Sequence, residues 1–192
     1  MTRRFSSIPF VVLMLASCGG GSALDNAPEI ANPASTGGRK LSFVYFQKCV
    51  EPVLQAQISS AGGSNSCTGS GCHDTVAGTG GALRIVPGAA EVTDFTLAID
   101  VLRATDMYRN YYSAQGVTVI GAPDESRLVN KPLLQGVLHG GGLIFSDSND
   151  ARVQALRYWI SRPVPEGQDE FSTSANTMFT PADPASGACK VE

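Results

Sequence analysis

The sequence has little positive charge, few histidines and no long apolar run, and each shortage limits what the chain can do. It has 14 Lys and Arg residues and 17 Asp and Glu residues, which gives a formal net charge of −3. Nucleic acids require a basic protein surface, so this composition argues against a nucleic-acid partner. The chain contains only 2 histidines and 5 cysteines. Any metal or cofactor site therefore depends on very few side chains.

The N-terminus has the layout of a secretory signal peptide. Two arginines, Arg3 and Arg4, precede an apolar run from Ile8 to Ala16. That run is too short for a bilayer span, which needs roughly 20 residues. The tetrad Leu15-Ala16-Ser17-Cys18 resembles the lipobox of bacterial lipoproteins. This resemblance implies removal of residues 1–17, acylation of Cys18 and sorting to the outer membrane. The alternative is an ordinary cleaved signal peptide with an incidental cysteine.

Residues 18–40 are rich in Gly, Pro, Ala and Ser, and this composition predicts a flexible tether between the lipid and a folded domain. Loss of residues 1–17 removes two arginines and no acid, so the formal charge changes from −3 to −5. The roughly 150 residues after the tether suit a single domain.

The candidate cofactor-binding motif has the spacing Cys-x4-Cys-His and consists of Cys67, Cys72 and His73. A c-type haem is attached through two cysteines, and the histidine after the second one ligates the iron, usually in the spacing Cys-x2-Cys-His. The intervening residues here are Thr-Gly-Ser-Gly, which are small enough to form a longer loop without separating Cys72 from His73. We therefore predict one covalent haem c at these three residues.

Other interpretations of the cysteines stay open. A tetrahedral zinc site needs four ligands, and the motif offers three. A local Cys67–Cys72 disulfide forms easily in an oxidising compartment, but it leaves His73 without a role. The two remaining cysteines, Cys49 and Cys189, suggest one further disulfide, with two unrelated thiols as the alternative.

Apolar spacing predicts helices over 41–60, 91–115 and 148–162, and a short helix after Pro123 that Asp124 caps. Residues 81–88 are expected to be extended, and residues 163–192 to form an irregular tail. In the helix over 91–115, one stripe would bury Val92, Phe95, Ile99 and Leu102.

The order of several segments resembles a known family. The segments FQKCVEPVLQ, GCH, GALRI, GAPDESRLVNKPL and QALRYWI follow one another as in the small cytochrome c-like domains of exported bacterial proteins, of the planctomycete-cytochrome type. The resemblance covers residues 41–162. It implies a mostly α fold, in which a small cytochrome c-like helical domain places irregular loops around one haem, with residues 163–192 wrapped against it. The sequence departs from the family in its haem spacing and in carrying His-Gly-Gly-Gly at 139–142, where many members have Met-Pro-Pro for the sixth ligand.

His139 is the predicted sixth ligand of the iron. It lies where the resembling family places its distal ligand, and the three glycines after it would allow close approach to a flat macrocycle. A neutral imidazole is also a good iron ligand. The alternative is a loop histidine without a role. Met107 is the rival ligand, but its helical face, shared with Asp100 and Arg103, predicts exposure to solvent. The residues expected to line the haem are Phe43, Phe46, Leu83, Ile85, Leu133, Leu138 and Trp159.

Two histidine ligands would leave no open position on the iron, which favours electron transfer over catalysis. They also imply a lower reduction potential than a methionine ligand would give. The sequence thus predicts an electron carrier of the cell envelope, not an enzyme, with redox proteins and the membrane as its partners. Two alternatives remain: a haem-based ligand sensor with a labile His139, and a haem-free, disulfide-bonded interaction lipoprotein.

The lipid anchor is tested by replacing Cys18 with serine. We expect the wild-type protein to partition with membranes and into detergent, because an acylated N-terminus carries the apolar chains that a soluble N-terminus lacks. Cys18→Ser should block acylation and lipoprotein-type cleavage. Fractionation and intact mass measure both effects, and wild-type protein that is soluble and carries no added mass at Cys18 would contradict the prediction.

Overall fold

The computed structural model describes residues 38–60 and 63–192. The predicted signal peptide, Cys18 and nearly all of the predicted tether lie outside these residues. All described residues belong to one compact unit, residues 32–192. Within the described ranges, no helix is long and apolar enough to cross a membrane.

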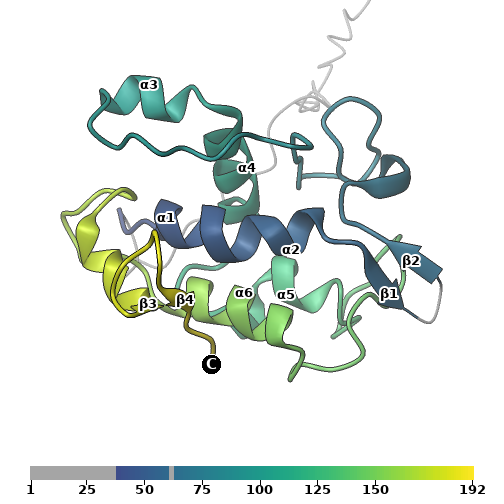
Figure 1. Ribbon diagram of the computed structural model, residues 1–192. Helices are drawn as coiled ribbons and strands as arrows, with labels where there is room; N and C mark the ends of the chain where they lie inside the picture. Colours follow the sequence, from purple (N-terminus) through teal and green to yellow (C-terminus); the bar gives the residue numbers. More distant parts are fainter. Residues whose placement is uncertain (1–37, 61–62) are drawn as a thin grey trace, which may run out of the picture. The chain divides into compact units, whose positions relative to one another are not determined.

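The helices and strands of this part are short (Figure 1). The α-helices are α1 (Phe43–Tyr45), α2 (Glu51–Gln55), α3 (Ile99–Arg103), α4 (Asp106–Gln115), α5 (Arg127–Asn130) and α6 (Ala151–Ser161). A π-helical segment, η1 (Phe46–Val50), joins α1 to α2, and 3-10 turns form at η2 (Gly69–Gly71), η3 (Pro123–Glu125) and η4 (Thr173–Met178). Two antiparallel pairs, β1 (Ile58–Ser60) with β2 (Gly63–Asn65) and β3 (Phe179–Thr180) with β4 (Ala188–Cys189), complete the elements.

The expectation of a mostly α, cytochrome c-like helical domain is wrong. The longest α-helix in the described residues, α6, has 11 residues. Residues 66–98 and 131–150 contain only turns, bends, one 3-10 turn and an isolated bridge between Asp74 and Ile85. These stretches are rich in glycine, which disfavours helices through backbone entropy.

Residues 43–55 form one continuous helical segment that packs against both α4 and α6 (Figure 1). The Ser42 hydroxyl caps it by accepting a hydrogen bond from the Tyr45 amide at 3.0 Å. The Phe46 ring lies 5.7 Å from the ring of Tyr111 on α4 and 5.4 Å from that of Trp159 on α6, measured between centroids. Aromatic pairs of this kind contribute about 0.5–1.5 kcal/mol each beyond their burial. They make this segment the centre of the core.

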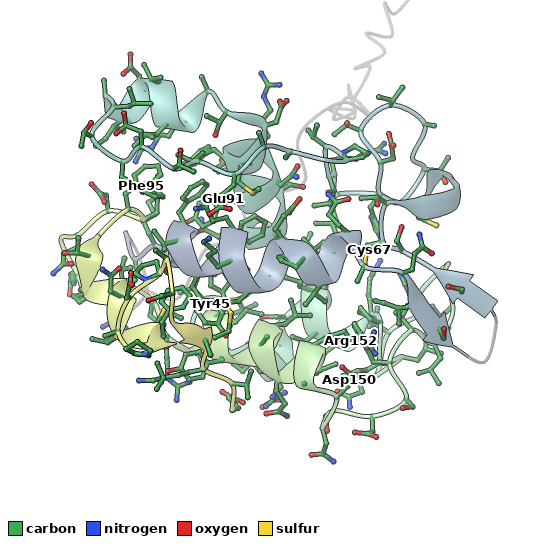
Figure 2. The ribbon with its side chains drawn as sticks, in the orientation of Figure 1. Tyr45, Cys67, Glu91, Phe95, Asp150 and Arg152 are labelled. Atoms are coloured by element: carbon green, nitrogen blue, oxygen red, sulfur yellow. A yellow bond between two sulfur atoms is a disulfide. The ribbon has the colours of Figure 1, made fainter. Side chains whose placement is uncertain are left out.

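The predicted helix over 91–115 is interrupted. Helix α3 begins only at Ile99, and the Thr105 side chain accepts a hydrogen bond from the Tyr108 amide at 3.1 Å, so it caps a new helix, α4. Phe95, which Figure 2 labels near the stretch before α3, is 38% exposed rather than buried in a stripe. Met107 is buried, with 4% exposed, so the expectation that it faces solvent is also wrong.

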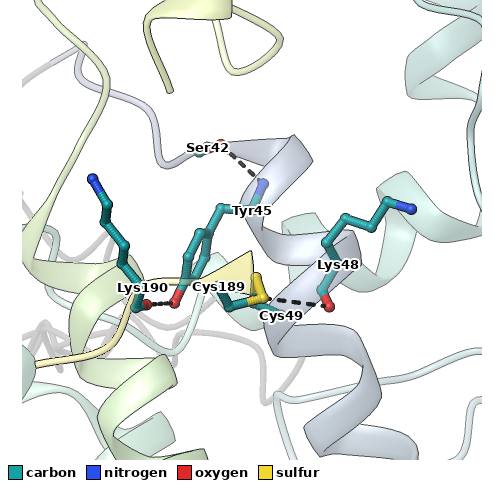
Figure 3. Close-up of a disulfide and its surroundings, with 6 residues drawn as sticks. All are labelled: Ser42, Tyr45, Lys48, Cys49, Cys189 and Lys190. Carbon is teal, nitrogen blue, oxygen red and sulfur yellow. Dashed lines mark hydrogen bonds between the residues drawn. A yellow bond between two sulfur atoms is a disulfide. The ribbon is translucent and has the colours of Figure 1, made fainter. Parts of the chain in front are cut away.

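The tail after residue 162 returns to the central segment instead of remaining irregular throughout. Cys49 of η1 and Cys189 of β4 are joined by a disulfide with an S–S distance of 1.94 Å, the pairing expected from the cysteine count (Figure 3). Beside this bond, the Tyr45 hydroxyl donates a hydrogen bond to the Lys190 carbonyl (Figure 3). The fully buried Glu170 carboxylate binds the Arg103 guanidinium at 2.8 and 3.1 Å.

Replacing Cys189 with serine should loosen this tail. Loss of a native disulfide in a small domain costs about 2–5 kcal/mol, because the unfolded chain is no longer cross-linked. We expect Cys189→Ser to lower the free energy of unfolding by that amount and to expose residues 179–192 to proteases. Urea unfolding and limited proteolysis measure these effects. Ser186→Ala, in the same exposed stretch, is the matched control, and identical cleavage of Cys189→Ser and this control would contradict the prediction.

Candidate functional site

A cavity of about 510 Å³ brings together the chemically distinctive residues of the chain. Both histidines, His73 and His139, line it, and so do Cys67 and Cys72, which are free thiols. Its volume falls within the range of roughly 300–1,000 Å³ that is typical of small-molecule and cofactor sites. A more open depression of about 590 Å³, beside Arg103 and Tyr112, has neither a histidine nor a cysteine in its wall.

The central helical segment supplies part of the cavity wall. Val53 and Leu54, at the end of α2, line the cavity together with Leu128 of α5 and Leu156 of α6. Figure 2 labels Cys67 close to this end of α2. The neighbouring Thr68 hydroxyl donates a hydrogen bond to the Gln55 side chain at 3.3 Å. The aromatic core and the cavity are therefore attached to the same helical segment.

The two extra residues of the Cys-x4-Cys-His motif are accommodated by a 3-10 turn. The Cys72 amide donates to the Gly69 carbonyl at 3.1 Å, and the His73 amide donates to the Cys67 carbonyl at 2.9 Å. Gly71 has a φ of +73°, a conformation that glycine adopts without strain. The turn thus brings the start of the motif back to its end.

The His73 ring is fixed by a backbone carbonyl. Its Nδ1 lies 3.0 Å from the Leu83 carbonyl oxygen, so Nδ1 carries the proton and Nε2 keeps its lone pair for a ligand. The segment with Leu83 is itself held by α4, because the Asn110 side chain accepts from the Val86 amide at 2.6 Å and donates to the Val86 carbonyl at 3.0 Å. Asn110 also donates to the Glu51 carboxylate at 2.9 Å, which links this loop to α2.

The His139 ring has the same arrangement in its own loop. Its Nδ1 lies 2.8 Å from the Gly142 carbonyl oxygen, and the Gly142 amide donates to the His139 carbonyl at 2.9 Å. Gly142 has a φ of +72°. This conformation lets the loop turn back onto the ring, whereas the predicted approach of the glycines to a macrocycle stays a prediction. In both histidines Nε2 remains available for a metal.

The two imidazole rings are nearly parallel, and their separation can be compared with that of two ligands of one ion. Their centroids lie 6.3 Å apart and their planes differ by 9°. With a metal–nitrogen bond of about 2.0 Å and a ring radius of about 1.1 Å, rings on opposite sides of one ion have centroids about 6.2 Å apart, against about 5.1 Å at a tetrahedral ion. The separation therefore fits a linear arrangement better than a zinc site. The described residues contain no group of three or more His, Cys, Asp or Glu side chains that could hold a metal ion.

Burial decides the protonation of two of these groups. It lowers the pKa of His73 below the usual value, against the opposing effect of the Leu83 carbonyl, so the ring is neutral at pH 7. Burial also raises the pKa of the Cys67 thiol to about 11, with a smaller contribution from Cys72. A thiol with such a pKa is not a reactive thiolate, which argues against Cys67 as a nucleophile.

Some residues predicted to line a haem do not lie at the cavity. Leu83 lines it, but Leu138 is 91% exposed and lies outside the wall. Phe43, Phe46 and Trp159 are buried in the aromatic core instead, and Met107 is buried away from the cavity wall. Phe43, Phe46 and Trp159 pack within the aromatic core, while Phe145 is a large aromatic residue of the cavity wall.

Comparison with known protein families, curated proteins and solved structures gives no match. The resemblance noted in the sequence stays a prediction.

Sequence reasoning missed two basic residues of the cavity wall, Arg127 and Lys131. Their separation of four residues places them on one face of a helix, which is the signal that could have revealed them. The spacing alone, however, does not show which face of the helix lines the cavity.

Gly80 leaves no room for a side chain beside the His73 ring and gives a direct test of the site. A Cβ atom at position 80 would lie 2.5 Å from His73 Nδ1 and 2.5 Å from the Cys72 carbonyl oxygen. We expect Gly80→Ala to displace the ring, to abolish the Nδ1–H signal of the bond to Leu83 in ¹⁵N NMR, and to cost about 1–3 kcal/mol of stability.

Gly140→Ala is the matched control, because a Cβ at position 140 meets nothing within 4 Å. It should leave the NMR signal and the stability unchanged. An intact Nδ1–H signal in Gly80→Ala would show that the ring position described here is wrong.

Proposed function

We propose that this protein is a monohaem c-type electron carrier of the cell envelope. Cys67 and Cys72 would form the thioether bonds, and His73 and His139 would be the axial ligands of the iron. The observation that carries the proposal is the pair of parallel imidazoles, 6.3 Å apart, with both Nδ1 atoms bonded to carbonyls. A lipid anchor at Cys18, the outer membrane as location and redox proteins as partners complete the proposal.

The state of the two thiols supports covalent attachment. Thioether formation adds each S–H across a vinyl group, so the sulfur bonds one carbon, the hydrogen goes to the other, and no oxidant is needed. The thiols must be reduced for this step, and both Cys67 and Cys72 are free while Cys49 and Cys189 are paired. Free thiols at the motif also count against the local Cys67–Cys72 disulfide.

When bound, the haem supplies a one-electron ferric–ferrous couple. The chain supplies a fixed and closed environment for it. The carbonyls of Leu83 and Gly142 hold the two rings, so neither ligand has to move when the charge on the iron changes. If both His73 and His139 bound the iron, no position would be left for a substrate. This arrangement favours electron transfer over catalysis.

The proposal is tested on protein produced together with a cytochrome c maturation system. The pyridine haemochrome spectrum and intact mass should show one covalent haem, with a low-spin spectrum. Cys72→Ala should lose most of the covalent haem, because it removes one thioether and the sulfur next to His73. His139→Ala should convert the spectrum to high spin and open the iron to carbon monoxide.

Leu138→Ala is the matched control, since Leu138 precedes the ligand and is 91% exposed. It should keep the low-spin spectrum. Colourless, folded wild-type protein would contradict the proposal and favour a haem-free interaction lipoprotein. Carbon monoxide binding by the reduced wild type would contradict the closed iron and favour a sensor with a labile His139.

A further inference from the structure

The charges in the cavity wall are all of one sign. Arg127 and Lys131 line the cavity, and its wall contains no aspartate or glutamate. The chain as a whole has the opposite balance, with a formal charge of −3. Two cations gathered at one cavity of an acidic protein indicate a ligand that carries negative charge.

The Arg127 and Lys131 side chains have no polar partner among the described residues. Among the described residues, no ion pair or side-chain hydrogen bond is formed by Arg127 or by Lys131, although ion pairs occur elsewhere in this part of the chain. Asp124, the acidic residue three positions before Arg127, binds Arg157 of α6 at 2.7 Å instead. Arg127 and Lys131 therefore keep their charges available to a ligand.

Their position suits the acidic edge of a flat apolar molecule. Arg127 is exposed and Lys131 is half-buried, whereas Leu128, between them on α5, is buried and also lines the cavity. Residues four apart on a helical turn project on the same side. The wall is thus apolar inside and cationic where it meets solvent.

Resting on the proposed function, we propose that Arg127 and Lys131 bind the two propionate carboxylates of the haem and so fix the orientation of the macrocycle in the cavity. Arginine presents a planar set of N–H donors that matches a carboxylate, and lysine adds a compact second charge. The His73 and His139 rings define only the axis through the iron. The two cations would decide which edge of the macrocycle faces solvent.

The test uses the full-length chain with Cys67→Ala and Cys72→Ala, so that different haems can be loaded through the histidines alone. This protein and its Arg127→Gln/Lys131→Gln derivative are each loaded with iron protoporphyrin IX or with its dimethyl ester, which has no carboxylates. Transfer to excess apomyoglobin gives the dissociation rate. We expect the derivative to lose the diacid about tenfold faster or more, equivalent to about 1.4 kcal/mol, and both proteins to lose the ester at the same rate.

Two controls separate charge from packing. Arg109→Gln removes an exposed basic residue that pairs with Asp106 at 2.7 Å and does not line the cavity, so it should not change either rate. Arg127→Lys/Lys131→Arg keeps both charges and should keep the slow loss of the diacid.

The proposal is overturned if the glutamine derivative releases the diacid at the unchanged rate, or releases both haems equally faster. It is also overturned if the charge-retaining variant behaves like the glutamine derivative, because the residues would then act by packing alone. Failure of both haems to give a low-spin complex would overturn the proposed function together with this inference, whereas low-spin binding with unchanged rates would overturn this inference alone.

Discussion

The position of the helical segment 43–55 between Tyr111 and Trp159 is the constraint on which the rest of the structure depends. The two aromatic side chains hold the segment from α4 and α6, and the Trp159 Nε1 donates to the Ser42 carbonyl at 2.9 Å. From this fixed segment, Val53 and Leu54 form part of the cavity wall, and Glu51 reaches the loop of Leu83 through Asn110. A shift of the segment would therefore move both a wall of the cavity and the carbonyl that orients His73.

The cavity is built from irregular backbone that is held by specific hydrogen bonds. Residues 66–85 contain only one 3-10 turn and an isolated bridge, yet His73 is bonded through its amide, its carbonyl and its ring. Irregular backbone can bring distant side chains to one point more freely than a helix can. The cost is that each polar group needs its own partner, and Asn110 shows how a single side chain serves three of them.

The local sequence signals predicted some elements and failed for others. The helix predicted over 148–162 is present as α6, which begins after Asp150 and ends before Pro163, and Cys49 and Cys189 form the expected pair. The prediction of one helix over 91–115 was wrong. The apolar spacing is continuous through this range, but Thr105 caps a new helix there. The mostly α fold was wrong because a family resemblance in short segments does not fix the long glycine-rich stretches between them.

The candidate site was partly predictable for a similar reason. His73 and His139 are the only histidines, so their pairing at one cavity followed from their scarcity once a two-ligand site was expected. The residues of the cavity wall were harder to predict from the sequence. Phe43 and Trp159 are large apolar residues that suit a haem pocket and an aromatic core equally well. Arg127 and Lys131 were not found, because the face that α5 turns to the cavity is set by tertiary packing.

The contacts of the first helical segment also determine when folding can be completed. Its partners lie far along the chain: Leu41 bonds Tyr111, Ser42 bonds Trp159, Cys49 bonds Cys189, and Tyr45 bonds the Lys190 carbonyl, 145 positions away. A helix this short is marginal by itself in water. Contacts of such sequence separation make folding slow, because a long loop must close before they form. The segment therefore lacks these stabilising partners until residues 111–190 have been synthesised, so its folding is completed late.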